Sequence, residues 1–113
     1  MKFSINQSEL QNALSVCVKG SSTRSTLSIL AGVYLKAEEG SLTLQTTNLE
    51  LSIKVTCPAL VEEQGESVVP AKLFLDIVKN LPDMAVRIES DDTTASVFCD
   101  TTTFSLKALN PLD

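Results

Sequence analysis

An internal duplication constrains the fold of this chain most strongly. The predicted elements run twice through the order strand, helix, strand, strand, strand. The two helices align when Leu10 is matched to Phe74, an offset of 64, and the strands that follow align when Val33 is matched to Val86, an offset of 53. The difference is about the length of the hydroxyl-rich segment 20–28, which the second half lacks. We therefore predict two structural repeats inside one domain.

The periodicity of the hydrophobic residues places the individual elements. Alternation of apolar and polar residues predicts strands, and apolar residues three and four positions apart predict helices. The domain covers residues 1–113, with repeats at about 1–60 and 65–109, joined by an acidic connection at 60–65. In the first repeat we predict strands at 1–5, 29–37, 42–47 and 49–56, and a helix from a cap at Asn6 to Val18. In the second repeat we predict strands at 66–69, from 86, at 95–99 and at 103–109, and a helix at 71–81.

The second helix is bracketed by Pro70 and Pro82, because proline is tolerated at a helix entrance but not in a helix interior. One of its faces is a continuous apolar stripe, made by Leu73, Phe74, Ile77, Val78 and Leu81, with Leu75 at the border. The opposite face carries Lys72, Asp76 and Lys79. This helix is therefore expected to pack by one side and to present two ammonium groups on the other.

Two such repeats predict an α+β fold with two antiparallel sheets and two helices packed side by side on one face. The polar faces of both helices then point the same way. They carry Lys19, Lys72 and Lys79, with Arg24 at the edge of the surface, whereas most acids fall on turns and linkers. Although the net charge is −5, this local basic surface is suited to contacting phosphates without reading bases.

Composition excludes several other classes of protein. No apolar run approaches the roughly 20 residues of a membrane span, and the first residues turn polar too early for a signal peptide, so we expect a cytoplasmic chain. Three widely spaced cysteines and no histidine argue against a zinc site or a Cys–His nucleophile. Adjacent carboxylates such as Asp91 and Asp92 lie in turn-like segments, where solvated charges are usual. We expect no catalytic residue, no metal and no cofactor.

Several short motifs in order resemble the first domain of the bacterial DNA sliding clamp, the beta subunit of the replicative polymerase. The most specific one leads from a strand into the second helix, as Val-Pro-Ala, a basic residue, an aromatic, Asp-Ile and Leu-Pro. Here it is met by Val69, Pro70, Ala71, Lys72, Phe74, Asp76, Ile77, Leu81 and Pro82. Further matches at residues 1–3, 24–30, 40–44, 47–50 and 104–106 extend the resemblance over the whole chain.

This resemblance implies a DNA-clamp fold and a non-catalytic processivity factor. In the family, three such domains form a chain, and two chains close head to tail into a ring that encircles duplex DNA and tethers the polymerase. The implied partners are double-stranded DNA, a second clamp subunit as a homodimer, and the polymerase and clamp loader, which bind through domains absent from these 113 residues.

The resemblance also implies roles for particular residues. Arg24 matches a position that contacts DNA, and we add the helix lysines Lys19, Lys72 and Lys79 to this surface. Phe104 and Leu106 match a strand at the subunit junction. The chain departs from one member of the family there, because Thr94, Thr101 and Thr103 stand where that member carries basic residues on its last two strands.

Two other interpretations compete with a clamp domain. A β-rich protein-interaction or dimerisation module without a nucleic-acid role would use the edge strand at 103–109, and it explains the acidic charge more simply. It does not explain the placement of the cations. An enzyme is the weaker alternative, since the sequence holds no glycine-rich phosphate loop and no nucleophile–base pair.

Overall fold

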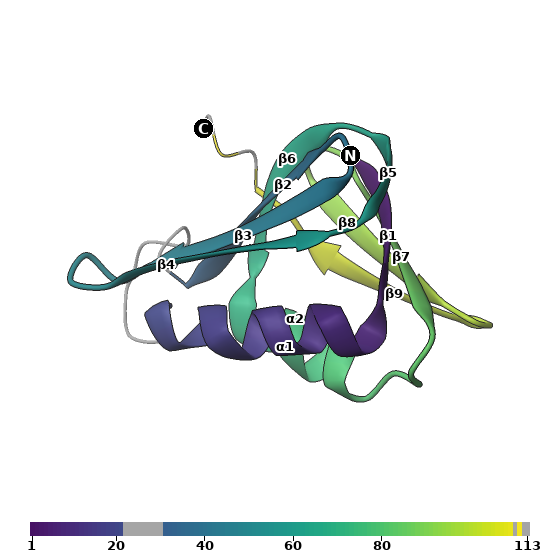
Figure 1. Cartoon of the computed structure of the whole chain (residues 1–113), viewed down its shortest axis with the longest axis horizontal. Helices are drawn as coiled ribbons and strands as arrows, with labels where there is room; N and C mark the ends of the chain where they lie inside the picture. The colour runs from purple at the N-terminus through teal and green to yellow at the C-terminus, as the bar shows by residue number, and fades with distance from the viewer. Residues whose placement is uncertain (22–30, 110, 112–113) are drawn as a thin grey trace.

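The computed structural model describes residues 1–21, 31–109 and 111, which form two sheets above a layer of two helices (Figure 1). The first repeat contains β1 (Lys2–Asn6), α1 (Gln7–Cys17), the 3-10 turn η1 (Val18–Gly20), β2 (Gly32–Glu38), β3 (Ser41–Thr47) and β4 (Ser52–Pro58). After β5 (Leu60–Glu63), the second repeat contains β6 (Gly65–Pro70), α2 (Ala71–Lys79), β7 (Ala85–Ser90), β8 (Thr94–Cys99) and β9 (Thr102–Lys107).

Each repeat contributes its first strand to the sheet of the other repeat. The five-stranded sheet has the order β5-β1-β7-β8-β9, and the four-stranded sheet has the order β4-β3-β2-β6, with every pair antiparallel. The two exchanged pairings are equivalent, because Val33 lies opposite Val69 in one sheet and Val86 lies opposite Ile5 in the other. These residue pairs are related by the offsets of 53 and 64 that the sequence displays.

The two helices lie side by side and antiparallel, so the start of each lies near the end of the other. The side chain of Gln7, at the start of α1, donates a 2.8 Å hydrogen bond to the carbonyl of Val78 near the end of α2. Equivalent backbone bonds hold the two helix starts: Gln7 N donates to Met84 O at 3.0 Å, and Ala71 N donates to Ala31 O at 3.1 Å. This arrangement places both helices on the same side of the sheets (Figure 1).

The hydrophobic core fills the space between the sheets and the helices. Its largest fully buried side chains come from both helices and both sheets, and they include Phe3, Leu10, Leu14, Leu35, Leu44, Phe74, Val78 and Ile88. Matched positions of the repeats are equally buried, since Leu10 is 0% and Phe74 is 1% exposed. The helix layer is therefore fixed to the sheets by burial of apolar surface, the dominant favourable term in folding.

Three predictions about elements are wrong. The connection at 60–65 contains the strand β5, because β1 has a free edge beyond β7 and Val61 can pack against the core opposite Phe3. The strand predicted at 49–56 begins only at Ser52, because Leu49 adopts a φ of 80° in the preceding turn. Leu73 is 51% exposed, whereas Leu75 packs against the core, because the buried stripe of α2 is centred on Phe74 and Val78.

Candidate nucleic-acid interface

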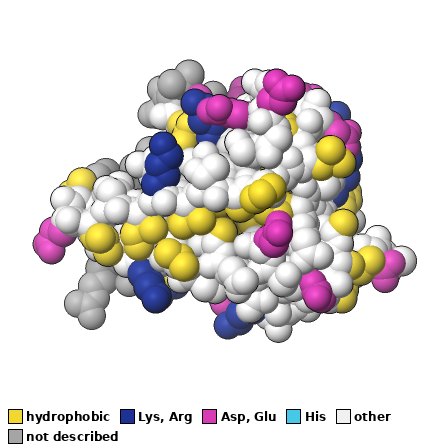
Figure 2. Space-filling model, viewed as in Figure 1, with side chains coloured by type: hydrophobic (Ala, Val, Ile, Leu, Met, Phe, Trp, Pro, Cys, Tyr) yellow, Lys and Arg dark blue, Asp and Glu magenta, His cyan; other side chains and the backbone are white. Residues whose placement is uncertain are grey.

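Three of the four predicted DNA-contacting residues lie on the helix layer. Lys19 is exposed in η1, Lys72 is exposed in the first turn of α2, and Lys79 is exposed in its last turn. Because the helices are antiparallel and η1 contacts α2, Lys19 and Lys72 lie at one end of the layer and Lys79 lies toward the other. Arg24 lies outside the described residues. Figure 2 shows basic side chains standing apart along the lower margin, where the helices lie.

Lys72 occupies a position that the electrostatics of the helix disfavour. The N-terminus of a helix carries a partial positive charge, and a cation in the first turn costs about 0.3–1 kcal/mol relative to favourable placement. The α2 helix has no acid in this turn, and its N-cap residue, Pro70, makes no side-chain cap. Fold stability therefore gives no reason for a lysine at this position.

The ion pairs of the helix layer are sparse. Lys79 Nζ lies 3.6 Å from an oxygen of Asp76, one turn earlier in α2. Among the described residues, no carboxylate lies within ion-pair distance of Lys19 or Lys72. Both remain available to an external anion.

Two cations of the five-stranded sheet, Lys2 on β1 and Arg87 on β7, are by contrast paired with carboxylates of the same sheet. Arg87 pairs with Glu62 and with Glu89, and Lys2 lies 3.8 Å from Glu89 and 3.9 Å from Glu63. The hydrogen bond from Arg87 lowers the pKa of Glu62, and the bonds to Glu62 and Glu89 raise the pKa of Arg87. Lys2 and Arg87 are therefore neutralised by carboxylates within the fold, unlike Lys19 and Lys72.

The four-stranded sheet repeats this pattern at one of its lysines. Lys36 lies 3.0 Å from Glu38, and that hydrogen bond raises the pKa of Lys36. Lys54 on β4 is exposed with no such partner among the described residues, and so is Lys107 on β9. Lys54 stands between Ile53 and Val55, whose half-buried side chains face the helices, so its own side chain is on the opposite face of the sheet.

The predicted junction residues separate into one exposed and one buried side chain. Phe104 is 36% exposed, whereas Leu106 is 3% exposed and belongs to the core. In the described part of the chain, β9 pairs only with β8, so its outer edge is open. Of the two predicted residues, only Phe104 is therefore presented to a neighbour, beside the open backbone edge of β9.

A second open edge and an apolar band were missed by the sequence analysis. Strand β4 pairs only with β3 among the described strands, and hydrophobic side chains run along it above α1 (Figure 2). Val16 and Leu51 are each 46% exposed, and Leu49 is 78% exposed. The alternation at 49–55 indicated an apolar face, but it could not show that this face is only half covered.

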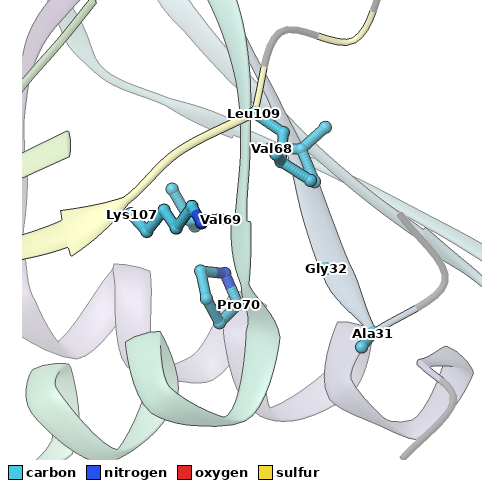
Figure 3. A pocket seen from close by; sticks show the side chains of 7 residues that line it. All are labelled: Ala31, Gly32, Val68, Val69, Pro70, Lys107 and Leu109. Atoms are coloured by element: carbon cyan, nitrogen blue, oxygen red, sulfur yellow. The ribbon is translucent and has the colours of Figure 1, made fainter. Parts of the chain in front are cut away.

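The chemistry of the described surface gives no support to catalysis. A pocket of about 260 Å³ between β2, β6 and the segment after β9 is lined by Ala31, Gly32, Val68, Val69, Pro70, Lys107 and Leu109, with Lys107 as its one charged side chain (Figure 3). Burial raises the pKa of Cys17 to about 11, so this thiol stays protonated at neutral pH. No cluster suited to a metal ion occurs among the described residues, and no described helix is long and apolar enough to cross a membrane.

Comparison with known proteins agrees with this geometry. The family described as DNA polymerase III beta subunit, N-terminal domain, matches residues 1–113. The chain is 36% identical over 113 residues to the beta sliding clamp homolog GriR of Streptomyces muensis, which covers 100% of this chain and 30% of that protein. It is 35% identical over 109 residues to the beta sliding clamp of Streptomyces coelicolor, which covers 96% of this chain and 29% of that one.

Solved structures give the same result. The DnaN sliding clamp of Bartonella birtlesii is 31% identical with a TM-score of 0.95, covering 100% of this chain and 32% of that chain. A Helicobacter pylori beta clamp bound to a DNA ligase peptide, at 22% identity and a TM-score of 0.95, shares the fold. The chain spans about a third of the length of these relatives.

Proposed function

The chain belongs to the family of DNA polymerase III beta subunits, as their N-terminal clamp domain, and from this premise we propose that it forms part of a ring that encircles duplex DNA. The ring slides because its contacts to the phosphate backbone are few and independent of sequence. It tethers the replicative polymerase and is itself non-catalytic. With three free thiols, two buried and one half-buried, the domain suits the reducing cytoplasm.

The observation that carries this proposal is the contrast between the two surfaces of the domain. Lys2 and Arg87 of the five-stranded sheet are paired with carboxylates, whereas Lys19 and Lys72 on the helix layer have none within ion-pair distance among the described residues. Lys72 also opposes the helix dipole, so its placement has a cost to the fold. An external polyanion supplies the missing partner.

The open strand edges suit assembly into a ring. We propose that β9 pairs with a second subunit through its backbone and through Phe104, with Leu106 acting from inside the core as support. Strand β4, the counterpart of β9 in the first repeat, offers an edge toward the opposite end of the molecule (Figure 1). Two such edges fit a head-to-tail arrangement, in which each contact joins unlike surfaces.

Polymerase and clamp loader are proposed to bind outside these 113 residues. The Helicobacter pylori clamp that binds a DNA ligase peptide supports the idea that clamps of this fold dock protein segments. We assign no residue of this chain to such a site.

The DNA-facing surface can be tested on the chain itself by NMR. Titration with a short duplex at about 50 mM salt is expected to shift the amides around Lys19, Lys72 and Lys79, with the shifts fading at about 200 mM salt. Lys72→Glu should weaken binding, whereas Lys54→Glu, an identical charge change on the other face of the sheet, should not. Equal losses from both variants would show that net charge alone governs binding and would remove the assigned face.

Retention in a ring tests the proposal further. Residues 1–113 would replace the matching domain of the Streptomyces coelicolor clamp, and the hybrid would be loaded on nicked circular DNA. The double variant Lys72→Glu/Lys79→Glu should shorten the time that the ring stays on the DNA. It should also reduce the slope of log affinity against log salt concentration by about 1 for each phosphate contact that is lost. Retention equal to that of the unmodified hybrid would argue against the helix layer as the DNA surface.

The alternative of an interaction module without nucleic acid is favoured by one observation, the open β9 edge with Phe104 beside it. Under that function, Phe104→Asp would abolish self-association while the helix lysines proved neutral in every DNA assay. Under the clamp function, both classes of variant matter.

A further inference from the structure

A buried hydroxyl fixes the point at which α1 ends. Thr46 is 2% exposed near the end of β3, and its Oγ1 donates a hydrogen bond to the carbonyl of Cys17, the last residue of α1. The carbonyls of the last turn of a helix lack intrahelical partners, so a donor here satisfies one of them. The thiol of Cys17 makes a weaker contact with Leu44 O at 3.6 Å, so the same residue is tied to β3 twice.

A second close contact lies just beyond Lys19. Gly20 is buried, and a Cβ at this residue would lie 2.6 Å from Thr46 Oγ1 and 3.2 Å from two carbons of Ile53. The hydroxyl cannot withdraw without losing its bond to Cys17. The backbone is thus held against Thr46 on both sides of Lys19, whose own side chain is exposed.

The second repeat lacks this arrangement. Leu35 pairs with Leu44 as Ile88 pairs with Val97, so Thr46 corresponds to Cys99, which carries a thiol in place of the hydroxyl. By the offset of the helices, Lys19 corresponds to an acid, Asp83. The buried hydroxyl and the exposed cation therefore occur together, in one repeat.

We propose that Thr46 is a positioning residue for DNA binding: through Cys17 and Gly20 it holds the η1 turn so that Lys19 faces the phosphate backbone. This inference rests on the proposed function of the helix layer. The hydroxyl does not touch DNA, and its effect passes through the cation that it orients.

A double-mutant cycle on the chain tests this role, with duplex affinity measured by NMR titration at about 50 mM salt. Lys19→Ala should weaken duplex binding by roughly threefold to tenfold. It should also reduce the slope of log affinity against log salt concentration by about 1. Thr46→Val keeps the shape but removes the donor, and it should produce a similar loss when Lys19 is present. In the Lys19→Ala background it should add little, whereas Thr46→Ser, which keeps the hydroxyl, should restore wild-type affinity.

The outcomes separate the inference from the function on which it rests. If Lys19→Ala leaves affinity unchanged, Lys19 is not a DNA contact and both statements fail at this residue. If Lys19→Ala weakens binding but Thr46→Val does not, or if the two losses add fully, only the positioning role is overturned. Should Thr46→Val not fold, Thr46→Cys copies the residue that the second repeat tolerates, and the same cycle is run with it.

Discussion

The two repeats share one core but differ at the ends of their elements. Leu10 and Phe74 are buried alike, and the exchanged pairings Ile5–Val86 and Val33–Val69 match in register. The helix ends differ: the end of α1 is held by a buried hydroxyl from β3, whereas α2 is followed by its C-cap residue Asn80, whose side chain donates to the carbonyl of Asp76 at 2.7 Å.

The hairpins that end the repeats differ as well. Cys99 pairs with Thr102 around a tight turn in which Asp100 has a φ of 53°. In the first repeat the turn between Thr47 and Ser52 is longer, and it places Leu49 at a φ of 80° with 78% of its surface exposed. The duplication therefore accounts for what holds the domain together, and the departures from it occur at the helix ends and in the hairpin turns.

The largest loss of stability is expected when a buried side chain that a helix contributes to the shared core is truncated. Phe74→Ala is expected to lower the free energy of unfolding by about 3–5 kcal/mol and Leu10→Ala by about 2–5 kcal/mol, because each leaves a cavity between helix and sheets. Urea denaturation followed by circular dichroism measures both. The matched control is Leu73→Ala, whose side chain is 51% exposed; a loss as large as that of Phe74→Ala would contradict the observed stripe.

The polar tie between the helices gives the next largest effect. Gln7 corresponds to Ala71 by the helix offset, so Gln7→Ala makes the two helix starts alike. Loss of its 2.8 Å bond to Val78 O and of its buried side chain should cost about 1–2 kcal/mol in the same denaturation experiment. Asn12→Ala, on the exposed face of α1, should be close to neutral, and a neutral Gln7→Ala would show that packing alone aligns the helices.

Much of the fold could be predicted because its signals are local. Alternation placed most strands, and the offset between Leu10 and Phe74 anticipated the equivalent helices. The role of Gln7 could not be found in this way, because its partner is a backbone carbonyl 71 residues away. Strand β5 was missed for a related reason, since its pairing depends on the free edge of β1.

The candidate site was predictable only in part. Helical periodicity was enough to place Lys19, Lys72 and Lys79 on the exposed layer. The contribution of Thr46 was hidden, because a threonine inside a strand is ordinary and its significance arises only when β3 packs under the end of α1. The difference between Phe104 and Leu106 likewise follows from what covers each residue, which alternation alone does not specify.

The effect of the basic residues on fold stability can be tested with charge-reversal variants at the two ends of α2. Lys72→Glu places an acid in the first turn and should raise the free energy of unfolding by about 0.3–1 kcal/mol while weakening duplex binding. Lys79→Glu should do the opposite to stability, since it removes a cation from the last turn and the 3.6 Å contact with Asp76. Thermal unfolding of the two variants side by side gives the signs, and a destabilising Lys72→Glu would indicate a structural role for this lysine.

The smallest expected effect on stability comes from an ion pair of β5, the strand that lies outside both repeats. The hydrogen bond from Arg87 lowers the pKa of Glu62 below its ordinary value of 4.5, so the folded state favours the ionised carboxylate. This contribution is present above pH 4.5 and is lost as the pH falls through the lowered pKa of the folded state. Because Arg87 and Glu62 are both substantially exposed, solvent and salt screen the pair and the effect stays small.

Glu62→Gln tests this contribution directly. The melting temperature of Glu62→Gln should lie slightly below that of the wild type at pH 7, and the two curves should converge as the pH is lowered toward 3. The control is Glu39→Gln, an exposed carboxylate with no ion pair in the described part of the chain, which should show no such convergence. A difference for Glu62→Gln that persisted at pH 3 would mean that packing of β5 on β1, and not the ion pair with Arg87, holds this additional strand in place.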